Sequence, residues 1–315
     1  MSSAVFSQVK IIFDTDLGAD ADDLGALAML HGFVENKECE LLGIMVWSNE
    51  VSVIPAIDAI NRYYNHPDIP LGIRAGEAYT IDWNHSKAIA DRLPNSLKNE
   101  DVQEATSLYR KILSENKDGS IVLVTVGPLM NIKNLIESGP DEYSDLSGKE
   151  LLHRKVKEMV VMGGQYPEGK KEWNFWGQMP GVTKYVFDHI QLPVVFVGYE
   201  IGEAIRTGEV FNDTNPDSPL YIGYKYFSEH ASWINKDYKG AILDNATFDQ
   251  TAVLYAVKGG VGTYWDKVEG GFNQIDEEGN NRWVKGKKTN QSFLRLTEDP
   301  ETMASIIEGL MLYND

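Results

Sequence analysis

The sequence is poor in cysteine, in basic residues and in long apolar runs. Cys39 is the only cysteine among 315 residues, which excludes an internal disulfide framework and any CxxC metal site. Lys and Arg number 29 against 47 Asp and Glu, and the net charge of -18 argues against nucleic acid and anionic membranes as partners, because phosphate groups need clustered cations. No run approaches the roughly 18 apolar residues of a spanning helix, and Met1–Lys10 shows no signal-peptide pattern. A soluble, cytoplasmic protein is expected, unless an export signal has been removed.

Short apolar runs alternate with segments of helical pattern along the chain. Apolar strands separated by helices predict an α/β fold, with a mostly parallel central sheet covered by helices on both faces. A turn-like segment between Val268–Phe272 and Asn281–Val284 predicts a small late β-hairpin. No linker interrupts the pattern, so one domain over residues 1–315 is expected. The expected strands are Val9–Phe13, Leu41–Trp47, Ser120–Val126, Lys157–Met162 and Leu192–Val197, and the expected helices are Leu24–His31, Ile54–Tyr64, Met130–Glu137, Gln250–Val257 and Pro300–Leu312.

The most informative segment is an aspartate cluster directly after the first expected strand. Five carboxylates fall within ten positions, at Asp14, Asp16, Asp20, Asp22 and Asp23. A solvated loop could tolerate them, but apolar residues anchor both ends of the segment in the expected core. Carboxylates packed together repel one another unless a cation lies between them, and hard cations such as Ca²⁺ or Mg²⁺ take oxygen ligands. The cluster therefore predicts a divalent metal site at the carboxyl end of a strand, where open α/β sheets place their sites.

Two other motifs begin in a similar way. An EF-hand loop needs glycine at its sixth position and glutamate at its twelfth, but counting from Asp14 those positions hold Ala19 and Gly25. A haloacid-dehalogenase-type, Mg²⁺-dependent phosphatase also starts with a strand ending in DxD, and Asp14 would be its nucleophile. That enzyme would have threonine or valine where Gly18 stands and a much later acidic pair, so it remains an alternative only.

The segment resembles the hallmark DxDxGxDD of the inosine–uridine-preferring nucleoside hydrolases, and the similarity extends along most of the chain. Four further blocks occur in the family's order. A single block would carry little weight, but five in the correct order are specific. The four are GIMVWSN at 43–49, VTVGPLMN at 124–131, VMGG at 161–164 followed by Glu172-Trp173-Asn174, and the block around Asp249.

The resemblance implies a nucleoside hydrolase-like fold and a Ca²⁺-dependent N-ribohydrolase, with a role for each matching position. Asp16 corresponds to the general base, which also contacts the metal. Asp23 and Asp249 correspond to carboxylate ligands, and Val126 to a ligand that acts through its backbone carbonyl. The positions that correspond to ribose contacts are Asp22, Asn49, Glu172 and Asn174, with Gln165 as a loose substitute for a further asparagine.

Departures from the family pattern matter as much as the matches. The motif here is DxDxGxDxDD, two residues longer, which leaves open whether Asp20 or Asp22 takes the ribose role; Asp22 is preferred because it keeps the adjacent pair intact. Phe248 stands where the family has a histidine linked to protonation of the leaving base. This replacement gives some weight to another alternative, a non-catalytic ribosyl-ligand-binding protein on the same fold.

Without that histidine, an aromatic sandwich around a protonated purine is one route for base departure. Its candidates are Trp47, Trp83, Trp173, Trp176 and Phe248, although core packing is the ordinary role of any single tryptophan. His85 or His230 reaching the base is the other route, and Tyr221–Trp233 is an aromatic helical segment that could serve as a lid. The chemistry expected is hydrolysis of ribonucleosides, with a lean towards purine nucleosides. A homo-oligomer, dimer or tetramer, is expected by analogy with the family.

Overall fold

The computed structural model describes residues 8–76, 83–286 and 289–313. A nine-stranded sheet runs through the molecule in the order β11-β14-β8-β6-β5-β1-β2-β3-β4. All neighbouring strands pair in parallel except β11, which is antiparallel to β14 at one edge. The strands are β1 (Val9–Thr15), β2 (Cys39–Val46), β3 (Leu71–Ile73), β4 (Gln103–Glu104), β5 (Ile121–Thr125), β6 (Val156–Met162), β8 (Val194–Val197), β11 (Trp265–Val268) and β14 (Gln291–Leu296).

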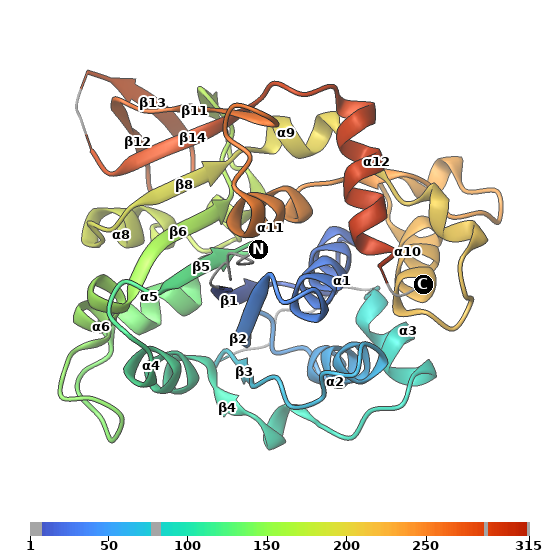
Figure 1. Ribbon diagram of the computed structural model, residues 1–315, viewed down its shortest axis with the longest axis horizontal. Helices are drawn as coiled ribbons and strands as arrows, with labels where there is room; N and C mark the ends of the chain where they lie inside the picture. The colour runs from blue at the N-terminus through green and yellow to red at the C-terminus, as the bar shows by residue number, and fades with distance from the viewer. Residues whose placement is uncertain (1–7, 77–82, 287–288, 314–315) are drawn as a thin grey trace, which may run out of the picture.

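Helices cover both faces of this sheet, as predicted (Figure 1). On one face lie α4 (Ala105–Glu115), α5 (Met130–Glu137), α6 (Gly148–Lys155) and α8 (Val182–His189). On the other lie α1 (Asp22–Glu35), α2 (Val53–Tyr63), α11 (Asp249–Lys258) and α12 (Pro300–Met311), with α3 (His85–Arg92) and α10 (Pro219–His230) packed beyond them. Two short helices, α7 (Trp173–Trp176) and α9 (Tyr199–Ala204), follow strands at the carboxyl edge.

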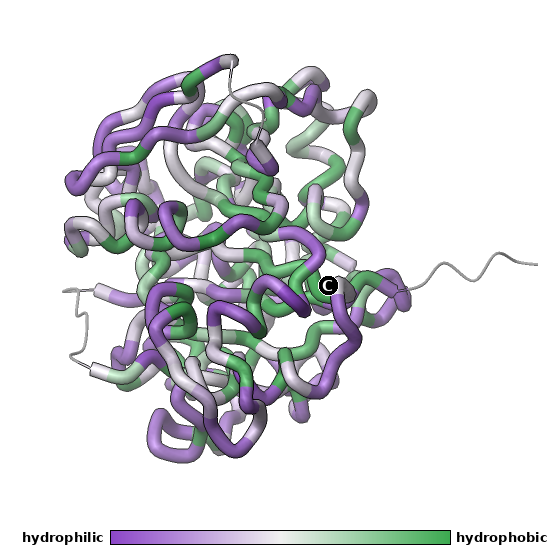
Figure 2. Tube along the Cα trace, turned by 90° about the vertical axis from the view of Figure 1, so that its left-hand side faces the viewer, coloured by the Kyte–Doolittle hydropathy of each residue, from purple (hydrophilic) through white to green (hydrophobic). Residues whose placement is uncertain are grey.

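The strands are buried on both sides because their apolar side chains alternate between two cores. Ile11 and Phe13 of β1 belong to the core under α1 and α11, whereas Ile12 between them belongs to the core under α4 and α5. Such two-sided burial explains why the central strands are nearly continuous apolar runs. Along the chain trace, the hydrophobic stretches gather in the interior and the hydrophilic ones lie mostly at the periphery (Figure 2).

The late hairpin is present, but one of its predicted strands has the wrong bounds. Gly270, with φ of 78°, makes a turn that divides Val268–Phe272 between β11 of the large sheet and β12 (Gly271–Ile275). Strand β12 pairs antiparallel with β13 (Asn281–Lys285), and β13 pairs with β7 (Glu168–Gly169) to complete a small sheet. A third, two-stranded sheet joins β9 (Arg206–Thr207) to β10 (Asn245–Ala246).

Among the residues that the structure describes, no helix is both long and apolar enough to span a membrane. Residues 1–7 of Met1–Lys10, the segment in which a signal-peptide pattern was sought, lie outside the described residues.

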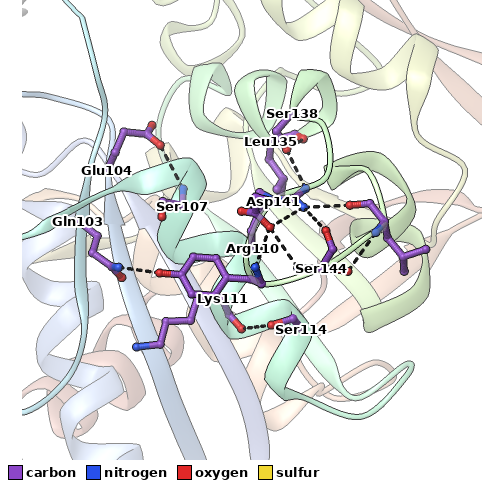
Figure 3. A network of polar contacts seen from close by, with 12 residues as sticks. Gln103, Glu104, Ser107, Arg110, Lys111, Ser114, Leu135, Ser138, Asp141 and Ser144 are labelled. Atoms are coloured by element: carbon purple, nitrogen blue, oxygen red, sulfur yellow. Dashed lines mark hydrogen bonds and ion pairs between the residues drawn. The ribbon is translucent and has the colours of Figure 1, made fainter.

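A buried arginine fixes the connection between α5 and α6 to helix α4. Arg110 is 2% exposed, and its guanidinium pairs with the Asp141 carboxylate at 2.7 Å. It also donates to the carbonyl oxygens of Ser144 and Leu146, at 3.1 and 2.9 Å. Figure 3 shows this side chain extending from α4 into the loop that carries Asp141 and Ser144. One side chain thus satisfies several acceptors of an otherwise irregular loop.

Arg110→Ala is expected to lower the free energy of unfolding by about 2–4 kcal/mol, because it removes the counter-charge of the partly buried Asp141 carboxylate and the side-chain donor to the Leu146 carbonyl. Urea denaturation measures this loss. Arg154→Ala is the matched control: its partner Asp118 is, like Arg154 itself, 57% exposed, and such a surface pair contributes less than about 1 kcal/mol. Equal losses in the two variants would contradict the structural role of Arg110.

Candidate active site

The aspartate cluster lies in the loop between β1 and α1, at the carboxyl end of a central strand. The backbone of this loop needs glycine at position 18. The φ of Gly18 is 142°, and a Cβ there would lie 2.8 Å from the amide group of Asn84. Its carbonyl accepts a hydrogen bond from the backbone N–H of His85 at 2.9 Å, which fixes the loop to α3. The glycine of the motif is therefore required by backbone conformation and by space.

Three carboxylates from opposite ends of the chain converge beside this loop. Asp22 and Asp23 begin α1, and Asp249 begins α11. Each offers an oxygen within 4.8 Å of the others, and all three side chains are buried. Two helix N-termini thus bring carboxylates to the same point in space. The free N–H groups of such termini favour negative charge. The predicted meeting of Asp249 with the aspartates after β1 is observed.

The electrostatics of the cluster are unfavourable without a cation. Burial raises the pKa of Asp22, Asp23 and Asp249 well above the ordinary value, and the charges of neighbouring aspartates raise it further. No Lys or Arg within the described parts of the chain forms an ion pair with any of them. Burying several like charges is costly unless a counter-ion is present. An all-oxygen, all-carboxylate donor set fits a hard divalent cation.

Asp16 and Asp20 flank the three and are each fixed by hydrogen bonds. The Oδ2 atom of Asp16 accepts from the indole N–H of Trp173 at 2.8 Å. Asp20 accepts through Oδ1 from Asn245 Nδ2 at 2.5 Å and from the backbone N–H of Ala21 at 2.6 Å. Burial raises the pKa of Asp16 to about 7 and that of Asp20 to about 6. Both carboxylates therefore hold protons more readily than ordinary aspartates, because burial disfavours their charged form.

A cavity of about 810 Å³ opens beside the carboxylates. Ten of the eleven residues predicted for catalysis, metal binding or substrate binding line it. They are Asp16, Asp22, Asp23, Val126, Gln165, Glu172, Trp173, Asn174, Phe248 and Asp249. Asp20, the alternative ribose contact, lines it as well. The exception is Asn49, which is absent from the lining and whose amide donates to the Gly76 carbonyl.

Glu172 and Asn174 connect the cavity wall to two strands. The Glu172 carboxylate accepts from the backbone N–H groups of Gly164, at 2.7 Å, and of Asn174, at 3.1 Å, so it caps α7. Burial raises its pKa to about 7. Asn174 donates through Nδ2 to the carbonyl oxygens of Val126, at 3.0 Å, and Met162, at 3.2 Å. Because a carbonyl oxygen has two lone pairs, that of Val126 can accept this bond and still meet a cation.

Aromatic side chains form two further walls. Phe248 stacks on Tyr199, with ring centroids 5.0 Å apart, and Trp83 packs against Trp233 at 5.4 Å. All four line the cavity. Of the other candidate tryptophans, Trp47 and Trp176 are not among the lining residues.

Neither candidate histidine lies in the cavity wall. His85 is buried and hydrogen-bonds the Asp20 carbonyl at 2.7 Å, while His230 stacks on Tyr226 of its own helix and bonds the carbonyl of that residue. Of the predicted lid segment Tyr221–Trp233, only its last residue, Trp233, lines the cavity, and it comes after the end of α10.

Sequence reasoning missed Tyr199, Ile234, Asn245 and Ala246, all of which line the cavity. Only Tyr199 carried a usable signal, because it follows a buried strand at the carboxyl edge of the sheet. Asn245 and Ala246 belong to the two-residue strand β10, which is too short to give any pattern.

Asp14 is unsuited to act as a phosphatase nucleophile. It is 2% exposed, and its two carboxylate oxygens accept from the Tyr109 hydroxyl at 2.6 Å and from Asn131 Nδ2 at 3.2 Å. It does not line the cavity. A nucleophile must reach a substrate atom, so this geometry argues against the phosphatase alternative.

Comparisons with known proteins show the fold and the family of the chain. The chain is 29% identical to an uncharacterised protein of Schizosaccharomyces pombe over 174 residues, which is 51% of this chain and 50% of that protein. The matched part thus spans about half the length of this curated relative. A plant nucleoside hydrolase has the same fold, with a TM-score of 0.70, 16% identity and coverage of 96% of this chain and 98% of that one.

An inosine-guanosine nucleoside hydrolase has the same fold with a TM-score of 0.69, 19% identity and the same coverage of both chains. The sequence model of the inosine-uridine preferring nucleoside hydrolases matches residues 11–297, nearly the whole chain. The chain therefore belongs to the inosine-uridine preferring nucleoside hydrolase family.

Proposed function

We propose that the chain hydrolyses the N-glycosidic bond of ribonucleosides to ribose and free base, with Ca²⁺ bound at the aspartate cluster and with a preference for purine nucleosides. The observation that carries the proposal is the convergence of Asp22, Asp23 and Asp249 at one end of a substrate-sized cavity. Family membership supports the same reaction.

Asp23 and Asp249, with the Val126 carbonyl and Asp16, are the groups that would hold the cation. A divalent cation there supplies positive charge that lowers the pKa of a nearby water. Asp16 takes the proton of the attacking water, since its carboxylate lines the cavity and is fixed by Trp173. Asp22 lies within ligand reach of the same point, and together with Glu172, Asn174 and Gln165 it offers acceptors and donors to the ribose hydroxyls.

The aromatic walls of the cavity stabilise the base as it leaves. N-glycosidic hydrolysis builds positive charge on the ribose and negative charge on the leaving group, as in other glycoside cleavages. Phe248 takes the place of the family's histidine and cannot donate a proton to the leaving base. The base must then take its proton from water, and stacking between aromatic rings would stabilise the protonated form. A purine suits this route best, because it offers the larger ring system for stacking. The expected homo-oligomeric state remains a prediction.

The reaction is tested by measuring ribose release from inosine and guanosine. Release is expected with Ca²⁺, to stop with a chelator and to return when Ca²⁺ is restored. Asp16→Asn is expected to lower kcat by about 100-fold or more, because general-base catalysis contributes roughly 10²–10⁴. Phosphate release from phosphoesters with Mg²⁺ would favour the phosphatase. Binding of a ribonucleoside without ribose release would favour a non-catalytic protein on this fold.

Base preference gives a separate prediction. Inosine and guanosine are expected to have higher kcat/KM than uridine, and 2′-deoxynucleosides are expected to be poor substrates because contacts to the 2′-hydroxyl are lost. Phe248→Ala is expected to lower kcat/KM for inosine by about 3- to 10-fold, the usual worth of one aromatic contact. A strong preference for uridine would contradict the proposed role of the aromatic walls.

Metal binding can be tested without turnover, by thermal unfolding with and without Ca²⁺. Saturating Ca²⁺ is expected to raise the Tm of the wild type by roughly 5 °C, because a ligand at 100 times its Kd stabilises the folded state by about 2.7 kcal/mol. Asp249→Asn should lose most of this rise. Without Ca²⁺ this variant should melt no lower than the wild type, because one buried like charge has been removed.

Asp266→Asn, which changes an exposed residue paired with Arg295, serves as the control and should keep the full rise. An undiminished rise in Asp249→Asn would exclude Asp249 as a ligand.

A further inference from the structure

Trp173 occupies the centre of a row of three indoles. It lies 6.4 Å from Trp47 and 6.2 Å from Trp176 between ring centroids, and both contacts are T-shaped, with interplanar angles of 82° and 80°. Trp173 and Trp176 are the first and last residues of α7, and their spacing of three places them on the same side of that helical turn. The Trp173 ring is therefore held from two elements of the fold.

Cations lie over both outer members of this row. The Arg74 guanidinium lies 5.4 Å from the Trp47 ring, and its Nε donates to the Trp47 carbonyl at 2.6 Å. The Lys171 ammonium lies 5.4 Å from the Trp176 ring and pairs with Glu278 at 2.8 Å. Cation–π contacts of this kind are attractive and help to hold a ring in place. The outer indoles are thus fixed, and the central one has little freedom to turn.

The fixed orientation directs the only polar group of Trp173 at Asp16. The indole N–H donates to Oδ2 at 2.8 Å, a length typical of a hydrogen bond to a charged acceptor. The other carboxylate oxygen lies near Gly127, where any side chain would be too close: a Cβ there would lie 2.9 Å from Oδ1. The Asp16 carboxylate is therefore held at Oδ2 by the indole, while the missing side chain of Gly127 leaves room for Oδ1.

We propose that Trp173 is a positioning residue for the general base, rather than a stacking partner for the leaving base. By donating to Oδ2, the indole fixes the rotation of the carboxylate and leaves Oδ1 to take the proton of the attacking water. This inference rests on the proposed function of Asp16. The three indoles then act in the catalytic step by positioning Asp16. Contact with the base is made by the other aromatic walls, the Phe248–Tyr199 pair and the Trp83–Trp233 pair.

The test is Trp173→Phe, which keeps an aromatic ring and removes the N–H. We expect kcat to fall by about 10- to 100-fold, because a hydrogen bond to a charged group that orients the reacting atoms is lost. KM for inosine should stay within about threefold, since no substrate contact is removed. If Trp173 stacked on the base instead, its replacement would raise KM. If its role were purely structural, the replacement would lower Tm and would not lower kcat selectively over KM.

Trp176→Phe is the matched control, because it makes the same change in the same row without touching Asp16. Its effect on kcat should be at least tenfold smaller than that of Trp173→Phe. Equal losses of kcat in the two variants would mean that packing alone matters, which overturns the proposal.

Tryptophan emission gives a second readout that needs no turnover. Ca²⁺ added to the wild type is expected to change the emission, because the Trp173 indole N–H is bonded to a carboxylate beside the cation. The change should persist in Trp176→Phe and be lost in Trp173→Phe. A change of wild-type size in Trp173→Phe would contradict the coupling of this indole to Asp16.

Failure of this inference differs from failure of the proposed function. A wild-type protein that releases no ribose under any metal condition removes the proposed function, and the role of Trp173 with it. Ribose release by the wild type with an unchanged kcat in Trp173→Phe removes only the role of Trp173.

Discussion

Repulsion among buried carboxylates is the constraint on which the rest of the site depends. Asp22 and Asp23 come from the first helix and Asp249 from a helix much later in the chain. All three side chains are buried, with one carboxylate oxygen of each within 4.8 Å of the others. Folding has to bring these like charges together out of water, where their mutual interaction is weakly screened. A divalent cation bound at these carboxylates would offset this cost, so metal binding would also stabilise this edge of the sheet.

The parallel sheet is what makes such a meeting possible. Strands β1, β5 and β6 run side by side and end at one edge, where the loops after them carry Asp16, Val126 and the glycines before Glu172. Ligands of open α/β sheets bind at this edge because the connections after the strands all gather there. The apolar cores on the two faces hold the strands in register, and this fixes the positions of the loops that follow them.

Sequence reasoning predicted five of the nine strands of the central sheet, β1, β2, β5, β6 and β8, but not β14, and it predicted ten of the residues that line the cavity. Strands such as β5 and the second half of β6 are largely apolar, and several residues that line the cavity, such as Asp16, Val126 and Gln165, come soon after strands of this kind. Strands β3 and β4 were missed because they have three and two residues, too few for a pattern. Asn49 follows β2, as the family pattern predicts, but its side chain donates to the Gly76 carbonyl. This orientation depends on tertiary contacts, which the local sequence does not reveal. The bond between Trp173 and Asp16 joins residues 157 positions apart, so no local signal could reveal it.

The central claim, that this cluster binds one hard cation, is tested most directly by anomalous diffraction from crystals grown with Ca²⁺. We expect a single anomalous peak at about 2.3–2.6 Å from carboxylate oxygens of both Asp23 and Asp249. A fully ordered site without such a peak, or a peak that contacts neither of these residues, would contradict it.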